Sequence, residues 1–439
     1  MLRFYDTRET ALDELETVFS SRLTAASDAA EASVREILAQ VKARGDSAVL
    51  LYTRRWDYPK AEMLRVPQEA IEAAAARVRQ DSEVWAALNL AADRIRSFHE
   101  KQKRQSWFDV TSTPGETLGQ IIRPLARVGV YVPGGTAAYP STVLMTTIPA
   151  FVAGVRSVAL VTPPQADTGL PPDGTLAAAH LAGVTEIYGI GGAQAVGALA
   201  YGTESVRRVD KIVGPGNVFV NLAKRLVYGT VGIDMLAGPS EVAILADDTT
   251  DPEAAAADIL AQTEHDVLTS ALVATPSRAF ADALAAALAR QIETLPRADV
   301  CRRALESHGY LVLTRSLEEA AAVVSRYAPE HLHVDVAHPW EILGSIENAG
   351  AILLGPYTTA SHGDYIAGPS HTLPTAGCAR FASPLSVEDF IKRTSLLYLG
   401  KEASARLAPA VGRFAALEGL EAHRRAALRG TCSETEIAS

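Results

Sequence analysis

The sequence predicts an α/β fold built from two parallel-sheet regions, with a short N-terminal arm and a small helical C-terminal segment. Two observations lead to this fold class. Between residues 120 and 189, short apolar runs alternate with helix-length segments. A strand–helix–strand order returns between residues 310 and 336. Because a helix between two strands brings the chain back in its original direction, each region is expected to form a parallel sheet.

The composition is that of a large globular protein. The chain has 439 residues, of which 48% are hydrophobic and 21% charged, so it is long enough for several domains. A net charge of -10 without a basic stripe argues against a nucleic-acid partner. Cys301, Cys378 and Cys432 are isolated, and residues 1–6 lack an apolar signal-peptide core, so a cytoplasmic location is expected. The apolar stretch 143–155 is too short to cross a membrane and predicts a buried helix.

The N-terminal part is expected to be scaffold. Residues 1–23 are polar with scattered large apolar side chains and are interpreted as an arm. Helical patterns follow, the longest from 81 to 105, and His99 near its end is expected to be solvated. The expected divisions are residues 1–23 as the arm, 24–128 with 240–385 as a first α/β domain, 129–239 as a second, and 386–439 as a C-terminal helical domain.

Two glycine-rich loops suggest a nucleotide site. Residues 189–194 and 214–217 each follow a predicted strand, where glycine lets the backbone approach a phosphate at a helix N-terminus. The first loop matches GxGxxG incompletely, since Gln194 stands where the third glycine would be, and glycines at such a place often serve only the turn. Both loops would lie at the carboxyl edge of one sheet, and together they indicate a nucleotide.

A carboxylate and an imidazole meet at a predicted helix-to-strand junction. A helical pattern covers 316–327, and Pro329 is expected to end it and to push Ala328 toward an extended conformation. From His331, alternating apolar residues predict a half-buried strand. Glu330 and His331 should therefore point different ways and act on different atoms of one substrate. A chance Glu–His pair is the more frequent explanation of such a pentapeptide taken alone.

Other polar groups cluster later in the chain. A helix predicted to begin at Asp251 carries Gln262 and His265 one turn apart on one face, so that both could reach one metal ion. A surface helix end with a stray histidine explains that spacing equally well. The loop 361–375 is the densest polar loop and contains Asp364 and His371.

Nine motifs give the chain a strong resemblance to the histidinol dehydrogenase family over nearly its whole length. In order they are YVPGG (131–135), GGAQA (191–195), GPGN (214–217), AGPSEV (237–242), QTEH (262–265), APEHL (328–332), GDY (363–365), HTLPT (371–375) and EGLEAH (418–423).

The resemblance implies a zinc-dependent enzyme that oxidises L-histidinol to L-histidine through L-histidinaldehyde with two NAD⁺, the last steps of histidine biosynthesis. It implies one Zn²⁺ per subunit and two incomplete Rossmann-like domains. It also implies a dimer-swapped homodimer, in which the C-terminal segment of one subunit completes the other's site. No membrane or nucleic-acid partner is expected.

The resemblance also assigns roles to residues of this sequence. Its zinc ligands correspond to Gln262, His265, Asp364 and His423, and its acid–base pair to Glu330 and His331. Substrate contacts fall on these six residues and on Ser240, His371 and Glu418, and nucleotide contacts on Tyr131, Gln194 and Asn217.

Three other functions stay open. A family member that oxidises another small alcohol, such as a sulfonated diol, would keep zinc, NAD and the Glu–His pair. A catalytically silent protein could use zinc only to hold a dimer together. A generic Rossmann dehydrogenase is disfavoured by the incomplete GxGxxG and by the lack of an obvious acidic residue for the ribose.

Overall fold

The computed structural model describes residues 2–20, 28–110, 112–134 and 138–429. Contacts divide the chain into two units. The first contains Met1–Gln102 and Leu125–Phe390, and the second contains Lys103–Pro124 and Ile391–Ser439. The predicted α/β class with parallel sheets is confirmed, since the first unit holds two sheets whose paired strands all run parallel.

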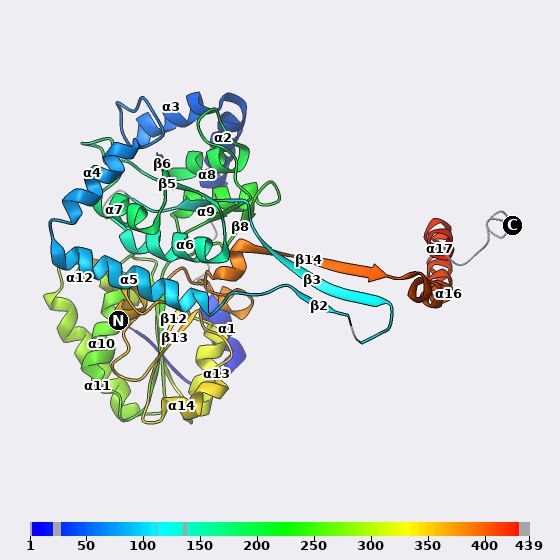
Figure 1. The fold of residues 1–439 in the computed structure, drawn as a ribbon. Coiled ribbons are helices and arrows are strands. Elements are labelled where there is room, and N and C mark those ends of the chain that lie inside the picture. The colour runs from blue at the N-terminus through cyan, green and yellow to red at the C-terminus, as the bar shows by residue number, and fades with distance from the viewer. Residues whose placement is uncertain (1, 21–27, 111, 135–137, 430–439) are drawn as a thin grey trace. The chain divides into compact units, whose positions relative to one another are not determined.

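One sheet of the first unit has five strands, and Figure 1 shows helices on both of its faces. Its order is β6 (Glu186–Gly189), β5 (Ser157–Thr162), β4 (Arg127–Tyr131), β7 (Lys211–Val213) and β8 (Gly232–Ile233). Counted along the chain from β4, this is third, second, first, fourth and fifth. The direction of winding therefore reverses between β4 and β7, the place where α/β sheets bind ligands at their carboxyl edge.

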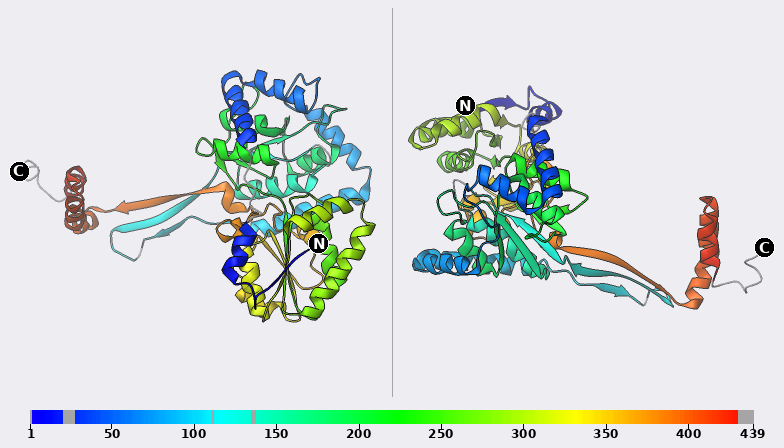
Figure 2. Two further views of the ribbon diagram at one scale, coloured as in Figure 1. Left: turned by 180° about the vertical axis from the view of Figure 1, so that it is seen from behind. Right: turned by 90° about the horizontal axis from the view of Figure 1, so that it is seen from above.

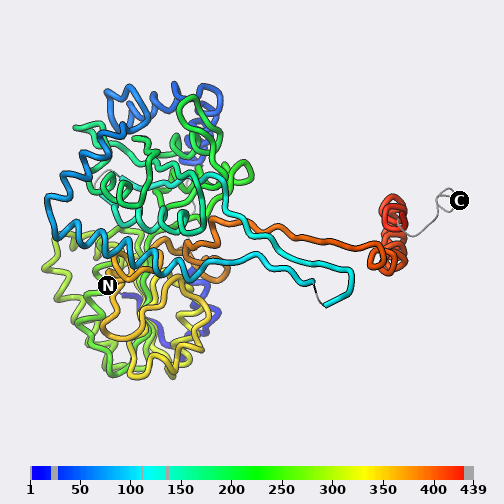
Figure 3. The backbone as a smooth tube through the Cα atoms, in the orientation of Figure 1, coloured from blue at the N-terminus to red at the C-terminus, as the bar shows by residue number. Residues whose placement is uncertain are grey.

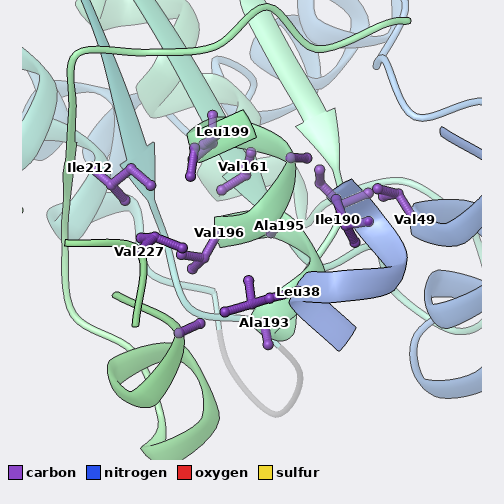
Figure 4. Packing of buried hydrophobic residues seen from close by; sticks show 14 of the residues in the cluster. Leu38, Val49, Val161, Ile190, Ala193, Ala195, Val196, Leu199, Ile212 and Val227 are labelled. Atoms are coloured by element: carbon purple, nitrogen blue, oxygen red, sulfur yellow. The ribbon is translucent and has the colours of Figure 1, made fainter. Parts of the chain in front are cut away.

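Two layers of helices cover this sheet. One apolar cluster unites it with α2 (Asp28–Arg44), α3 (Asp46–Trp56), α8 (Gly192–Tyr201) and α9 (Val218–Val227). In that cluster Leu38 and Val49 gather with Ile190 and Val196 (Figure 4). A second cluster contains α4 (Gln68–Val78), α5 (Ser82–Glu100), α6 (Pro140–Ala153) and α7 (Asp173–Ala182). Helices α2 to α5, which the expected division groups with residues 240–385, thus pack on the five-stranded sheet.

Two expectations for these helices have different outcomes. The apolar stretch 143–155 largely forms the buried helix α6, as predicted. Within the described ranges no helix is both long and apolar enough to cross a membrane. The expectation of a solvated His99 is wrong. The side chain is fully buried on α5, and its Nδ1 lies 2.8 Å from the Ile95 carbonyl oxygen, because this face of the helix packs into the core.

The other sheet has six strands and lies between two further helix layers (Figure 2). Its order is β1 (Arg3–Asp6), β11 (Gly309–Leu313), β10 (Ser270–Thr275), β9 (Glu241–Ala246), β12 (His331–Asp335) and β13 (Ala351–Leu354). One cluster of buried residues holds α10 (Pro252–Thr263), α11 (Arg278–Gln291) and α12 (Ala298–His308), and another holds α1 (Leu12–Ser20) and α13 (Leu317–Tyr327). The predicted arm therefore contains an edge strand, β1, whose backbone pairs with β11.

The second unit is built on antiparallel pairing. The strands β2 (Trp107–Asp109), β3 (Glu116–Pro124) and β14 (Ile391–Leu399) form a three-stranded sheet with β3 in the middle. Figure 3 shows β3 and β14 side by side. The helices α16 (Lys401–Leu417) and α17 (Glu421–Leu428) follow. The expectation of a wholly helical C-terminal segment missed β14, because that strand depends on pairing with residues more than 250 positions earlier.

Candidate active site

The Glu330–His331 pair lies at the start of β12. The preceding helix α13 is capped by Ser316, whose hydroxyl accepts the Glu319 N–H at 3.2 Å. The expectation that Ala328 is extended is wrong: its φ is 50° and its ψ is 62°, a left-handed conformation. This conformation lets the Ala328 N–H bond to the Val324 carbonyl and close the last turn of the helix before Pro329. It costs an alanine roughly 1–2 kcal/mol, and the surrounding structure must hold it in place.

The strand β12 is buried rather than half-buried. It lies between β9 and β13, with helix layers on both faces of the sheet. Leu332 and Val334 pack with the α13 layer, while His331 and His333 take the alternate positions. The ring of His333 reaches α10, where its Nδ1 lies 3.3 Å from Asp258 Oδ2. The alternating pattern from His331 to Val334 therefore reflects histidines and apolar residues that are all buried, and not one buried and one exposed face.

The carboxylate of Glu330 is enclosed and accepts a backbone hydrogen bond. Its Oε2 receives the Glu241 N–H at 2.9 Å, where β9 begins beside β12. Burial raises the pKa of Glu330 to about 7, although the neighbouring His331 imidazole acts in the opposite direction. A carboxyl group with such a pKa exchanges protons near neutral pH.

His331 lies between two carboxylates. Its Nδ1 is 3.7 Å from Glu330 Oε2, and its Nε2 is 3.3 Å from Asp364 Oδ1. Burial lowers the pKa of His331, but the hydrogen bond with Asp364 and the Glu330 charge outweigh burial, so that the net shift is upward. The Nδ1–Oε2 contact of 3.7 Å is too long for a hydrogen bond, so Glu330 and His331 lie near each other without bonding to each other. Together they form a proton-exchanging pair.

Asp364 also joins His371 to the site. It lies on α15 (Ala360–Tyr365), and its backbone carbonyl accepts a hydrogen bond from His371 Nδ1 at 2.9 Å. Nδ1 therefore carries the proton, and Nε2 accepts from the Thr142 hydroxyl at 3.2 Å. Burial lowers the pKa of His371, so the ring is neutral at neutral pH. Because Thr142 belongs to α6, which packs on the five-stranded sheet, this contact connects that sheet's helices to the polar loop that holds His371.

The remaining predicted ligands are distributed over the fold. Gln262 is buried near the end of α10, but the helix ends at Thr263 and His265 is exposed beyond it. The two residues therefore do not share one helix face as predicted; a turn links them, with the His265 N–H bonded to the Gln262 carbonyl at 3.1 Å. Glu418 and His423 are exposed and belong to the second unit, at the end of α16 and on α17. Among the described residues, no group of three or more His, Cys, Asp or Glu side chains is gathered so as to hold a metal ion.

The predicted nucleotide residues lie at the carboxyl edge of the five-stranded sheet. The Tyr131 hydroxyl, at the end of β4, accepts the Gly192 N–H at 3.1 Å. Gln194 is buried on α8. The Asn217 side chain caps α9 by accepting the Phe219 and Val220 N–H groups, each at 3.1 Å. Tyr131 ends β4 and Asn217 follows β7, the two strands at the switch point, while Gln194 follows the edge strand β6.

A seven-residue connection joins this edge to the acid–base pair. Residues 234–240 run from the carboxyl end of β8 to the amino end of β9, where Glu241 bonds Glu330. Ser240 is in this connection, and its carbonyl accepts the Ser270 N–H at 3.1 Å. The Gly238 N–H donates to the Thr375 hydroxyl in the polar loop. This connection and its hydrogen bonds therefore link the carboxyl edge of one sheet to the start of β9, beside the acid–base pair of the other.

A buried ion pair that the motifs did not reveal holds the second glycine-rich loop. Lys224 Nζ lies 2.5 Å from Asp234 Oδ1, and both side chains are fully buried. The same ammonium donates to the Gly214 carbonyl at 2.9 Å, while Asp234 Oδ2 accepts the Gly214 N–H at 2.7 Å. Gly214 has a φ of 110°, and a Cβ there would lie 2.1 Å from the Tyr131 carbonyl oxygen. A lysine within the apolar pattern of α9 was the only local sign of this arrangement.

Replacing Lys224 by methionine is expected to destabilise the protein by about 3–5 kcal/mol, because it leaves the Asp234 carboxylate buried without its partner. The double variant Lys224→Met/Asp234→Asn should recover part of this loss, since it removes both charges. Urea unfolding measures the difference. Arg278→Met, which breaks the exposed Arg278–Asp282 pair, is the control and should change little. Equal stability of the single and double variants would show that the unpaired Asp234 charge is not the cause of the loss.

The fold and site define an α/β oxidoreductase, in which a parallel sheet offers a nucleotide-type edge beside a buried carboxylate–imidazole pair. Residues 20–429 match the family model for histidinol dehydrogenase. The chain is 51% identical to the histidinol dehydrogenase of Geobacillus kaustophilus over 394 residues, which is 90% of this chain and 92% of that one. It is also 51% identical to the Moorella thermoacetica enzyme over 415 residues, covering 94% and 97% of the two chains. A solved histidinol dehydrogenase from Elizabethkingia anophelis, 34% identical, superposes with a TM-score of 0.92 over 100% of this chain and 99% of its own. The chain belongs to the histidinol dehydrogenase family.

Proposed function

We propose that this chain oxidises L-histidinol to L-histidine through L-histidinaldehyde with two NAD⁺, the last steps of histidine biosynthesis. The observation that carries the proposal is the enclosed Glu330–His331–Asp364 cluster beside the glycine-rich edge of the neighbouring sheet. An alcohol oxidation needs a base for the hydroxyl proton and an acceptor for the hydride, and these two places offer them.

The nucleotide is proposed to lie along the carboxyl edge of the five-stranded sheet. Tyr131, Gln194 and Asn217 are its proposed contacts. Their positions at the ends of β4, β6 and β7 support this, because the winding reverses there and two helix N-termini face the same edge.

His331 and Glu330 are proposed to divide the proton transfers. As a hydride leaves the carbinol carbon for NAD⁺, His331 takes the hydroxyl proton and the aldehyde forms. Glu330 then takes a proton from water as the water oxygen bonds to the aldehyde carbon, and protonated His331 returns its proton to the aldehyde oxygen, which gives the hydrated aldehyde. A second hydride leaves for the second NAD⁺ as His331 takes one hydroxyl proton, and the other hydroxyl proton passes to solvent as the carboxylate forms. Each transfer contributes roughly 10²–10⁴-fold.

A zinc ion fits the proposed ligands by their chemistry. Gln262, His265, Asp364 and His423 offer an amide oxygen, two imidazoles and a carboxylate, a mixed nitrogen and oxygen set that Zn²⁺ accepts. When bound, one zinc per subunit supplies a template that orients the substrate. Ser240, His371 and Glu418 are proposed substrate contacts.

The protein is proposed to be a homodimer whose C-terminal segment completes the partner's site. His423 and Glu418 support this, since both are exposed in the second unit while the other proposed ligands belong to the first. In this proposal residues 129–239 hold the nucleotide, and residues 240–385 carry the acid–base pair and most zinc ligands. The cytoplasmic location expected from the cysteines stays a prediction.

The oxidation of L-histidinaldehyde is expected to accelerate as pH rises through about 7. Glu330 takes a proton from water only as a carboxylate, and burial raises its pKa from 4.5 to about 7. Single-turnover rates with added aldehyde, measured between about pH 6 and pH 8, test this expectation. The Glu330→Gln variant is the control and should lose this part of the pH dependence. A wild-type rate that stays flat across the range would contradict the role of Glu330.

A panel of alcohols tests the choice of substrate. NAD⁺ reduction is measured with L-histidinol, imidazole-free amino alcohols and a sulfonated diol. The proposal predicts reduction with L-histidinol in clear preference to the others. Preference for the sulfonated diol would replace it with the function of another member of the same family, and absence of any reduction would favour a silent zinc-binding protein.

A further inference from the structure

An acidic side chain outside all the motifs lies against the first glycine-rich loop. Asp57 follows α3 and accepts a hydrogen bond from the Gly191 N–H. Its Oδ1 is 3.3 Å from the point where a Cβ on Gly191 would lie. Its Oδ2 is buried and has no hydrogen-bond partner among the described residues. Asp57 is half-buried, and this burial raises the pKa of its carboxyl to about 6. The unpartnered Oδ2 can accept a hydrogen bond from a ligand.

Two further polar groups meet at the same turn. Gln194 is 1% exposed, and its Oε1 is also buried and without a hydrogen-bond partner in the described part of the chain. That oxygen lies 2.7 Å from where a Cβ on Gly192 would be, so only glycine leaves room there. The Tyr131 hydroxyl accepts the Gly192 N–H, and burial, with a smaller contribution from the Asp57 charge, raises the pKa of this tyrosine to about 12. Buried polar atoms without partners are uncommon in folded proteins, and two of them, Asp57 Oδ2 and Gln194 Oε1, lie at this one loop.

The order of the strands indicates which end of a bound dinucleotide would lie at the loop after β6. The acid–base pair is reached from β8 by the connection 234–240, so the nicotinamide belongs near that end of the edge. Gly191 follows β6, the outer strand on the opposite side of the sheet. Four strand spacings of about 4.8 Å separate β6 from β8, about 19 Å in total, a span that an extended dinucleotide covers. The switch point between β4 and β7 lies between them and suits the pyrophosphate.

We propose that Asp57 is a further nucleotide-binding residue, whose carboxylate accepts a hydrogen bond from the adenosine ribose and selects NAD⁺ against NADP⁺. The assignment rests on the proposed function, since it needs a dinucleotide on this edge. A carboxylate favours the 2′-hydroxyl as a donor and repels a 2′-phosphate. In Rossmann folds the acidic residue that binds the ribose usually follows a strand. Asp57, which follows the helix α3, would take that role here.

The test measures binding of NADH and NADPH by fluorescence titration without histidinol. Asp57→Asn should weaken NADH roughly 10–100-fold, because a charge-assisted hydrogen bond is lost. NADPH should bind no more weakly than to the wild type, since the repulsion is lost as well. Asp167→Asn, an exposed aspartate in the loop after β5, is the matched control and should change neither affinity.

The outcomes separate the assignment from the proposed function. Wild-type protein that binds neither nucleotide would overturn both. Wild-type protein that binds NADH, with an Asp57→Asn variant of equal affinity or with NADH and NADPH weakened alike, would overturn the role of Asp57 alone. Should the variant fail to fold, the wild type still decides, because the assignment requires NADH to bind at least roughly tenfold more tightly than NADPH.

Discussion

Replacing Glu330 by glutamine is expected to preserve the first oxidation and to slow the second by roughly 10²–10⁴-fold. The glutamine amide has nearly the same shape and can still accept the Glu241 N–H through its oxygen, but it cannot take a proton from water. His331 keeps its contact with Asp364 and can still accept the alcohol proton. Stopped-flow absorbance should therefore show a rapid phase of one NADH per site, followed by a much slower second one.

One result of the same experiment would contradict the proposed roles of Glu330 and His331. If both phases slow equally, Glu330 is not specific to hydration of the aldehyde. His331→Asn is the matched comparison, because it should slow both phases: the imidazole is proposed to serve each oxidation. Added L-histidinaldehyde should not rescue Glu330→Gln, since hydration follows formation of the aldehyde.

Replacing Asp364 or His423 by asparagine is expected to weaken zinc and L-histidinol together. Loss of a direct ligand should exceed the roughly 10–100-fold loss of metal affinity that follows removal of an outer-shell partner. Zinc content after dialysis and L-histidinol affinity by calorimetry are the two measurements. A chelator should likewise lower both the zinc content and the affinity of the wild type.

His362 provides the control for these variants. It is an exposed histidine on α15, the helix of Asp364, and lies outside the proposed ligand set. His362→Asn should keep zinc and substrate affinity. Full zinc content and unchanged L-histidinol binding in Asp364→Asn or His423→Asn would show that the ligand set is wrong.

The sequence was sufficient to predict those features that depend on residues close together in the chain. Ser316 predicts the start of α13, and Asp251 caps α10 through the Glu253 N–H at 2.9 Å. The alternation of strands and helices predicts both parallel sheets. The left-handed conformation of Ala328 and the burial of β12 between two other strands were not predictable, because both depend on contacts beyond the local sequence.

Contacts between distant segments explain the other differences. The strand β14 exists only through its pairing with β3, and His99 is buried by packing that its charged local sequence opposes. Lys224 and Asp57 act on glycine-rich loops from separate elements, so no motif contains them together with the loops that they support. Spacing along the chain can show which residues share an element, but not which elements meet.

The stoichiometry of the complete reaction is the most direct test of the proposed catalytic pair. A limiting amount of L-histidinol is incubated with the wild-type protein, excess NAD⁺ and zinc until absorbance is constant. The proposed mechanism predicts two NADH per L-histidinol, with L-histidine as the product. One NADH per L-histidinol, with the aldehyde as the final product, would contradict the assignment of Glu330 and His331 to two successive oxidations.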